Sequence, residues 1–392
     1  MTEPIIGPVP GLMTGPTVLH VAQAVDTGVA HVLDDHIRHQ RANGWRVVVA
    51  CSGGMLGDVA RAAGAEVVAW AARREPGPGV VTEAVALAAV VRDVDPAVVH
   101  LHSAKAGLVG RLVVRGRRPT VFTPHAWSWL AAHGLTRRGA RAWERFAARW
   151  ADVVICLSLG ERREADELGI GSRLELVRND VPVDALRATA PPTTEAARVA
   201  VGLPADATVA VCCARLAPQK GQDVLLAAWA EVRRQVPTAS LVLVGDGPDR
   251  VALEERARAL DGVRFTGMVG RAESLTWMKA ATVVVCPSRY EGMSLVPLEA
   301  AALGRPVVAS WVEGMDGSLS AAARTIVAPE DPPALAAALV GYLGDPGLVA
   351  AGGAEAARWA DDSMAVQESV LRTTEIYAEL LRVGHGTRTV DR

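Results

Sequence analysis

Short β-branched apolar runs alternate with longer stretches of helical character through the first half of the chain. These runs are TVLHVA (17–22), WRVVVAC (45–51), EVVAW (66–70), AVVHLH (97–102), TVFTPH (120–125) and DVVICLS (152–158). A run that is apolar at nearly every position suits a strand covered on both faces, and intervening helices favour parallel pairing. The pattern therefore predicts a doubly wound α/β domain.

A second series of such runs follows, and a segment rich in proline, alanine and threonine without a strand signal separates the two. The second series is TVAVCCA (208–214), SLVLVG (240–245), VRFTG (263–267), TVVVCP (282–287) and PVVAS (306–310). We expect the following organisation: an N-terminal Rossmann-like domain over 1–185, a linker over 186–205, a second Rossmann-like domain over 206–365, and a C-terminal helix over 366–392 that returns to the first domain and ends in a loose tail.

Length and composition agree with this division. A chain of 392 residues is longer than one hydrophobic core usually supports. Half of the residues are apolar, 21% are charged, and the formal net charge is only -2. These values exclude a disordered chain, and they give no reason to expect a nucleic-acid partner.

The five cysteines and the N-terminus indicate the compartment. Each cysteine lies in or at the end of an apolar run, which favours small buried side chains in a reducing cytosol over a disulfide or metal framework. The first residues lack a basic leader, and no apolar run reaches the roughly 18 residues of a spanning helix. We expect a cytoplasmic protein, at most peripheral to the inner face of the membrane.

Glycine and polar residues follow several strands of the second half, where open α/β sheets collect their ligands. These residues are Arg215 and Lys220 after the first strand, Gly245 and Gly247 after the second, and Glu291 and Glu299 after the fourth. The chain uses lysine only at positions 105, 220 and 279, so a lysine in such a loop is not a neutral choice. Two cations beside a helix N-terminus suit a diphosphate.

Each of these residues also has a structural interpretation. Lys220 alone is typical of a solvated helix start. Glu291 and Glu299 are eight residues apart, so the pair could offer two carboxylates to a ribose diol and a sugar. Alternatively, Glu291 caps the helix and Glu299 lies on its surface.

Together these loops resemble a known family. ARLAPQKGQDVLLAAW, LVLVGDGP and YEGMSLVPLEAAALGRPVVAS, with its Glu-x7-Glu spacing, are similar to the donor domain of the retaining GT-B glycosyltransferases of family four. HLHSAKAGLVGRL and TPHAWSW resemble the acceptor domain of its bacterial members. The resemblance implies the GT-B fold, in which two Rossmann-like domains face each other across a cleft that binds a nucleotide sugar.

The resemblance also implies roles for matching positions. Arg215 and Lys220 would bind the diphosphate, Glu299 the ribose, and Glu291 the donor sugar. Catalytic roles fall on His125, Arg215, Lys220 and Glu291. Donor binding would involve Gly28, Arg215, Lys220, Gly245, Gly247, Glu291, Gly292, Met293, Ser294, Leu295 and Glu299. His125 would lie near the transferred sugar; the alternative for it is a strand-end residue that bonds to backbone.

The expected reaction needs no cofactor and no metal. Breaking the anomeric bond leaves charge on the diphosphate, which cations and helix amides can stabilise, and no Asp-x-Asp sequence stands at a strand end. The expected donor is a UDP-sugar, with a GDP-sugar or another nucleotide sugar as alternatives. The expected acceptor is a bacterial secondary metabolite, another small molecule, or a lipid-linked or cell-wall glycan precursor.

Three other functions stay open. A sugar nucleotide 2-epimerase of the GT-B fold shares the donor but transfers nothing, and a noncatalytic protein could bind the same donor. A dinucleotide-dependent oxidoreductase is disfavoured because no Gly-x-Gly-x-x-Gly follows the first strand.

The stretch 136–150 has two interpretations. It spaces Trp143, Phe146 and Trp150 by three and four residues, with arginines between them. Such a helix could lie on an anionic membrane beside a lipid-linked acceptor. Packing on its own sheet explains the same spacing and is the interpretation that we prefer.

Overall fold

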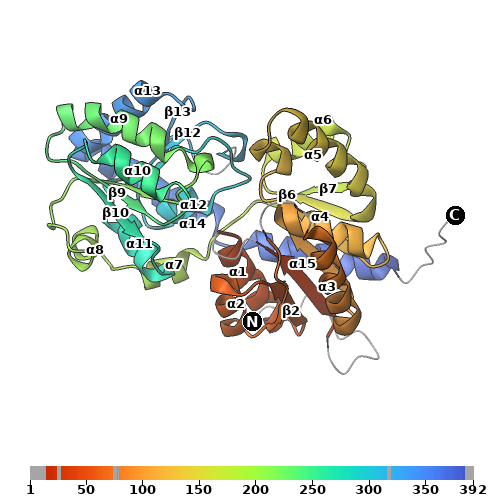
Figure 1. Cartoon of the computed structure of the whole chain (residues 1–392). Helices are drawn as coiled ribbons and strands as arrows, with labels where there is room; N and C mark the ends of the chain where they lie inside the picture. The colour runs from red at the N-terminus through yellow and green to blue at the C-terminus, as the bar shows by residue number, and fades with distance from the viewer. Residues whose placement is uncertain (1–14, 24–27, 74–76, 78, 316–318, 385–392) are drawn as a thin grey trace. The chain divides into compact units, whose positions relative to one another are not determined.

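The computed structural model describes residues 15–23, 28–73, 77, 79–315 and 319–384 (Figure 1). Its contacts divide the chain into two compact units. Unit 1 consists of the chain up to Asn179 together with the segment from Glu368, and unit 2 runs from Asp180 to Gln367. Each unit is described by itself.

Within the described residues, unit 1 contains a parallel sheet of seven strands in the order β3-β2-β1-β4-β5-β6-β7. The strands are β1 (Thr17–Ala22), β2 (Arg46–Cys51), β3 (Glu66–Ala69), β4 (Val98–His102), β5 (Thr120–Thr123), β6 (Val153–Cys156) and β7 (Arg173–Leu176). The helices are α1 (Gly28–Ala42), α2 (Gly54–Ala62), α3 (Val80–Val94), α4 (Ser103–Val114), α5 (Gly134–Ala147), α6 (Leu159–Leu168) and α15 (Glu368–Gly384).

The two faces of this sheet differ in polarity. Because side chains alternate along a strand, Leu19 of β1 and Leu101 of β4 join the apolar core against α3 and α4. The neighbouring side chains, His20 and His100, belong to the opposite face. There they hydrogen-bond to side chains of α1 and α15. One face of the sheet is therefore an ordinary apolar core, and the other carries buried histidines.

Unit 2 repeats the same topology. Its parallel sheet has, among the described residues, six strands in the order β10-β9-β8-β11-β12-β13. The strands are β8 (Val209–Cys213), β9 (Ser240–Val244), β10 (Val263–Gly267), β11 (Val283–Cys286), β12 (Val307–Ser310) and β13 (Arg324–Val327). The helices are α7 (Val183–Thr189), α8 (Thr194–Ala200), α9 (Gln222–Gln235), α10 (Arg250–Ala257), α11 (Arg271–Ala280), α12 (Leu295–Ala302), α13 (Pro332–Gly344) and α14 (Pro346–Ser363).

The order of strands determines where a ligand can bind. In both sheets the chain starts in the middle, adds strands to one side and then crosses to the other. The crossing lies between β1 and β4 in unit 1, and between β8 and β11 in unit 2. Loops that leave the carboxyl ends of two such strands diverge and leave a crevice between them. The predicted fold class, two doubly wound Rossmann-like sheets, is confirmed for each unit.

Two strands and the linker differ from the prediction. The sequence pattern missed β7 and β13, which lie at sheet edges, are short, and lack a continuous apolar run. The segment 186–205 is not an open linker: it contains most of α7 and all of α8, which pack against α11 and α12. Its alanines favour helix, and unit 2 begins at Asp180 rather than after 205.

The C-terminal helix α15 belongs to unit 1, where it contacts α1. The predicted tail over 385–392 lies outside the described residues. All five cysteines are free, and Cys51, Cys156, Cys212 and Cys213 are buried.

The helices of the described residues differ from typical membrane-spanning helices in length and hydropathy. None of these described helices is, taken singly, long and apolar enough to cross a membrane. One bent pair, Pro332–Gly344 with Pro346–Val383, meets the criteria of length and composition only.

Candidate functional site

A partly buried ion pair joins the loops that follow β8 and β11. Lys220 Nζ lies 2.5 Å from Glu291 Oε1, and the two side chains are 21% and 8% exposed. The Ser288 hydroxyl donates to the same carboxylate oxygen at 2.7 Å, and Gln219 Nε2 donates to Glu291 Oε2 at 3.3 Å. These loops leave adjacent parallel strands at the topological switch point. The structure thus brings Lys220 and Glu291 together.

A glycine allows the two loops to come this close. Gly221 has φ +65°, and a Cβ at this position would lie 2.0 Å from the carbonyl oxygen of Pro287. The backbone N–H of Arg289 donates to the Gln219 carbonyl at 2.8 Å. Gln219 Nε2 also donates to the Tyr290 carbonyl at 3.0 Å. The backbone of both loops is therefore fixed before any ligand arrives.

Arg215 provides a second cation at the same sheet edge. It follows β8 by two residues and is half-buried. Its backbone carbonyl accepts a hydrogen bond from Gln222 Nε2 at 3.0 Å. Its guanidinium has no hydrogen-bond or ion-pair partner among the residues that the structure describes. The guanidinium can therefore bind an anion without losing a protein contact.

The loop after β9 packs directly against the loop after β8. A Cβ at Gly245 would lie 2.2 Å from the carbonyl oxygen of Ala214, and one at Gly247 would lie 2.2 Å from that of Leu216. The Leu216 N–H donates to the Asp246 carbonyl at 3.0 Å. This close approach by itself requires both glycines. Their predicted contact with a donor stays a prediction.

The structure corrects the environment of Glu299. The sequence suggested a carboxylate free to bind a ribose, or else a surface residue. Glu299 is instead 3% exposed on α12, and its Oε1 atom forms an ion pair with Arg271, the first residue of α11. Arg271 was missed because it lies 28 residues away along the chain. Any ribose at Glu299 would share this carboxylate with Arg271.

The turn between Glu291 and α12 contains the remaining predicted donor contacts of unit 2. Gly292, Met293 and Leu295 are buried, and Ser294 is the N-cap of α12. The Ser294 side chain makes no capping hydrogen bond. The first amides of α12 therefore lack a side-chain acceptor from their N-cap, and they suit a polar ligand group.

In unit 1, Gly28 begins α1 and is exposed. The loop that precedes it, 24–27, lies outside the described residues. His125 follows β5 by two residues, is half-buried and has φ +51°, and the next residue, Ala126, has φ +87°. Left-handed backbone at two non-glycine residues needs support from neighbouring groups.

Glu161 provides that support. Its Oε1 accepts the Ala126 N–H at 2.7 Å, and its Oε2 accepts the Leu157 N–H at 2.7 Å. The Trp127 indole donates to the Glu161 carbonyl at 2.9 Å. Burial raises the pKa of Glu161 to about 7, and the two backbone hydrogen bonds oppose that rise. The turn that carries His125 is therefore held by one buried glutamate.

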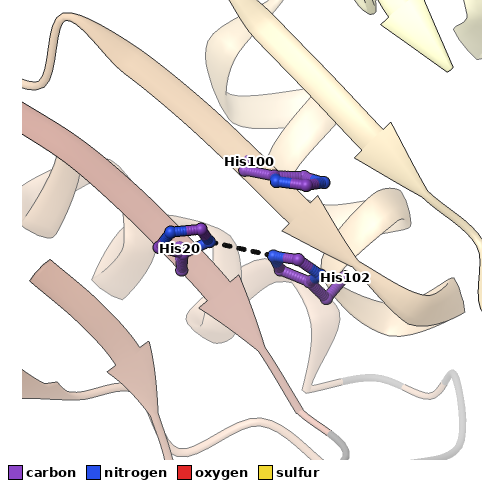
Figure 2. A group of neighbouring side chains, drawn as sticks. All are labelled: His20, His100 and His102. Carbon is purple, nitrogen blue, oxygen red and sulfur yellow. Dashed lines mark hydrogen bonds between the residues drawn. The ribbon is translucent and has the colours of Figure 1, made fainter. Parts of the chain in front are cut away.

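His125 ends a chain of buried histidines that the sequence prediction missed. His102 Nδ1 lies 3.1 Å from His125 Nε2. His20 Nδ1 lies 3.0 Å from His102 Nε2, and Figure 2 marks this second bond with a dashed line. His20 Nε2 lies 2.9 Å from Gln40 Oε1. Part of this cluster could be read from the sequence, because residues 100 and 102 of VVHLH share one face of a strand. The structure shows that His20 belongs to the adjacent strand.

His100 lies beside this chain and has its own partners. It is bonded to the Tyr377 hydroxyl at 2.5 Å and to Thr123 Oγ1 at 2.8 Å. One ring nitrogen from each of His20, His100 and His102 lies within 4.8 Å of the others, so the three could hold a metal ion. Every ring nitrogen of the three is nevertheless already hydrogen-bonded within the protein.

A small cavity of about 10 Å³ adjoins the histidines, enough for roughly one water molecule. Its lining includes His36, His100, His102, His125 and Asn179. Burial is the main cause that lowers the pKa of His20 and His125 to about 4 and that of His36 to about 3. The pKa values of His100 and His102 are also lowered, again mainly by burial. All five imidazoles are therefore neutral at pH 7.

We expect the free energy of unfolding to fall as the pH is lowered from about 6.5 toward 4. In this window the unfolded chain binds protons that the buried histidines of the folded protein do not bind, so each of these histidines lowers the free energy of unfolding as the pH falls. Glu161 acts in the opposite direction, because its raised pKa makes folding take up a proton below pH 7. Five histidines outweigh one glutamate. Urea unfolding at pH 7, 6 and 5 measures the slope, and constant stability would contradict this electrostatic description.

Helix α5 is partly packed into unit 1. Its Glu144 forms a buried ion pair with Arg111 at 2.6 Å, and the Arg111 guanidinium lies 4.1 Å from the Phe122 ring centroid and 5.8 Å from that of Trp143. Phe146, by contrast, is 45% exposed. Packing within unit 1 therefore accounts for Glu144 and Trp143 of α5. It does not account for Phe146, an exposed apolar side chain among arginines.

Comparison with known proteins relates these features to a family. Residues 27–180 match the family model of the glycosyl transferase 4-like domain, and residues 207–345 match that of the glycosyl transferases group 1. A GDP-mannose-dependent alpha-(1-6)-phosphatidylinositol monomannoside mannosyltransferase of Mycolicibacterium smegmatis is 34% identical over 278 residues, which is 67% of this chain and 70% of that protein. A D-inositol 3-phosphate glycosyltransferase of Kineococcus radiotolerans is 33% identical over 66% of each chain.

Solved structures show the same fold. Sucrose-phosphate synthase from Thermosynechococcus elongatus superposes with a TM-score of 0.79 at 21% identity, over 94% of this chain and 100% of that chain. Anabaena HepE in complex with UDP and glucose gives a TM-score of 0.75 at 20% identity, over 95% and 100% of the two chains. The family models and the mannosyltransferase, together with the two Rossmann-like sheets, identify the chain as a glycosyltransferase enzyme of the group 1 family, also called family four.

Proposed function

We propose that this protein transfers a hexosyl group from a nucleoside diphosphate sugar to a hydroxyl group of a bacterial acceptor, with retention of anomeric configuration. The observation that carries the proposal is the cationic edge of the unit 2 sheet. There Lys220 is held by Glu291 at 2.5 Å, and the guanidinium of Arg215 has no partner among the described residues. Such an edge at a topological switch point suits a diphosphate.

The proposed mechanism follows from the charge that develops when the anomeric bond breaks. Arg215 and Lys220 stabilise the negative charge of the leaving diphosphate, and the amides at the start of α12 add fixed dipoles. Glu291, an acceptor of hydrogen bonds when ionised, binds hydroxyls of the sugar, and Glu299 binds the ribose beside Arg271. His125 contacts the transferred sugar. Without a carboxylate nucleophile assigned, the acceptor attacks from the face that the diphosphate leaves.

Donor and acceptor are proposed from the relatives. HepE is solved with UDP-glucose, which supports a UDP-sugar, and the mannosyltransferase is named for GDP-mannose, which supports the alternative. The relatives named for phosphatidylinositol monomannoside and D-inositol 3-phosphate suggest inositol-containing acceptors as the first panel. Product analysis separates the rival functions: a new glycoside supports transfer, an isomerised nucleotide sugar supports epimerisation, and no product supports a binding protein.

A thermal-shift screen over nucleoside diphosphates tests the proposal. UDP or GDP should raise the melting temperature, because a ligand at about 100 times its Kd stabilises the folded state by roughly 2.7 kcal/mol. The nucleoside monophosphates serve as the matched control, since they keep the base and ribose but lack the second phosphate. If no nucleoside diphosphate shifts the melting temperature, the proposed donor site is wrong.

Turnover should survive a chelator. Because two side-chain cations and helix amides are proposed to neutralise the diphosphate, EDTA should leave the initial rate of transfer unchanged. Adding magnesium or manganese afterwards should have no further effect. A strict requirement for either metal would contradict this mechanism.

Peripheral membrane contact through α5 is also a proposal, supported by the exposed Phe146 among arginines. Co-sedimentation with vesicles containing anionic lipid tests it, and neutral vesicles are the control. If the protein co-sediments equally with anionic and neutral vesicles, the arginines of α5 do not attract it to anionic lipid.

A further inference from the structure

The histidine chain of unit 1 has a defined start. Gln40 on α1 is fully buried, and its Oε1 atom lies 2.9 Å from His20 Nε2. His20 and His102 are 0% and 1% exposed, so bulk solvent does not reach their ring nitrogens. The chain then runs from His20 through His102 to His125, with nitrogen to nitrogen distances of 3.0 and 3.1 Å.

A neutral imidazole has one N–H donor and one acceptor nitrogen, and the hydrogen bond at one nitrogen determines the state of the other. The rings are neutral at pH 7 because burial lowers the pKa of His20, His102 and His125. An amide oxygen can only accept. These two rules assign every proton in the chain for the amide orientation that the structure has, with Gln40 Oε1 and not Nε2 toward His20.

The assignment proceeds from the buried end. Gln40 Oε1 accepts, so His20 carries its proton on Nε2, and its Nδ1 is an acceptor. His102 must then donate from Nε2 to His20 and accept at Nδ1. His125 in turn donates from Nε2 to His102. Its own Nδ1 atom is left with a lone pair, and it has no protein partner among the residues that the structure describes.

We propose that Gln40, His20 and His102 are positioning residues that hold His125 in the Nε2–H tautomer, so that His125 Nδ1 offers a hydrogen-bond acceptor to a ligand hydroxyl. The inference rests on the proposed function, because it assigns that hydroxyl to the transferred sugar. It requires a ligand group that donates, such as a sugar O–H, and it excludes an anionic oxygen at this atom.

The left-handed turn supports the assignment. His125 and Ala126 keep positive φ values because Glu161 accepts the Ala126 N–H, so the imidazole is fixed at the end of the chain independently of any ligand. The two supports are separate: Glu161 fixes the backbone, and the histidine chain fixes the proton.

Nitrogen-15 NMR of histidine-labelled wild-type protein tests the proposal without substrate. A His125→Asn variant assigns the signals of residue 125. We expect a protonated Nε2 and an unprotonated Nδ1 at His20, His102 and His125, and a scalar coupling between His20 Nδ1 and His102 Nε2 through their hydrogen bond. An Nδ1–H tautomer at any of the three would overturn the proposal. Bound zinc in place of that coupling would overturn it as well.

Gln40→Glu is the decisive variant. When the introduced carboxyl group is protonated, its O–H donates to His20 Nε2, so His20 donates from Nδ1 and every bond of the chain reverses. An ionised carboxylate would accept as the amide does, so the proton between the introduced carboxyl group and His20 must be located. We expect His125 to become an Nδ1–H donor and kcat/KM for transfer to fall about 10-fold, the worth of one hydrogen bond. Thr123→Val is the matched control: it removes a hydrogen bond to His100, which lies outside the chain, and should leave the His125 tautomer unchanged.

The outcomes separate the two proposals. An unchanged His125 tautomer in folded Gln40→Glu protein, with the introduced carboxyl group protonated, would overturn the positioning role. If Gln40→Glu does not fold, or if its carboxyl group is ionised, the wild-type tautomers and coupling still decide the question. Correct tautomers in a protein that transfers no sugar would instead contradict the proposed function.

Discussion

Replacing Lys220 with alanine should lower kcat for sugar transfer by about 10²-fold or more, because it removes a cation proposed to stabilise the leaving diphosphate. The loss should be larger than for a surface lysine, since the ammonium is only 21% exposed and is fixed by Glu291. Removal also leaves the Glu291 carboxylate facing a negatively charged donor. Steady-state kinetics with saturating donor, together with a melting curve, measures the effect.

Lys279→Ala is the matched control for this variant. Lys279 lies in the same unit, at the end of α11, where its ammonium donates to the Leu303 carbonyl away from the loops after β8 and β11. The Lys279→Ala variant should retain the transfer activity of the wild-type protein. Equal activity of the Lys220 and Lys279 variants would show that the diphosphate site has been placed wrongly.

Replacing Glu291 with alanine should cost a similar 10²-fold or more in kcat, for a different reason. Glu291 accepts from Ser288 and Gln219 and pairs with Lys220, so its removal frees three side chains at once. The carboxylate is also the proposed acceptor for hydroxyls of the donor sugar. Glu291→Gln keeps the shape and removes the charge, so comparison of the two variants separates charge from packing.

Because Lys220 and Glu291 contact each other, their effects should not add. The double alanine variant should lose much less than the product of the two single losses, since each single change already breaks the same pair. A double variant whose loss equals that product would show that the two side chains act independently. If folded Glu291→Ala protein keeps the wild-type kcat, Glu291 has no part in the proposed mechanism.

Much of the fold was predictable because buried strands have continuous apolar runs. β1, β2 and β8 begin and end within a residue or so of the predicted runs. β7, with the sequence RLEL, was not predictable in this way. An edge strand has one neighbour and a partly exposed face, so charged side chains are tolerated and the apolar signal is lost.

The functional residues were predictable from the sequence only where they directly follow a strand. The loops that carry Lys220 and Glu291 both follow strands of a parallel sheet, so their position at the same edge could be predicted. The structure adds that β8 and β11 are neighbours. The pairing of Glu299 with Arg271 could not, because it depends on how two helices pack. The link from Gln40 to His125 depends on three successive contacts between separate elements. The alternation in VVHLH indicates that His100 and His102 share a face of the strand, but it does not indicate which side chains reach them.

Unit 1 is assembled from two segments of the chain that are separated by the whole of unit 2, and this affects how the protein is made. A ribosome releases the residues up to Asn179 long before it reaches α15, whose Tyr377 contacts His100 and Trp45. The part of the histidine face that α15 covers, around His100, therefore stays uncovered while all of unit 2 is being synthesised. A chain that stops before Glu368 would lack α15, which packs on the first unit, and would keep all of the second unit.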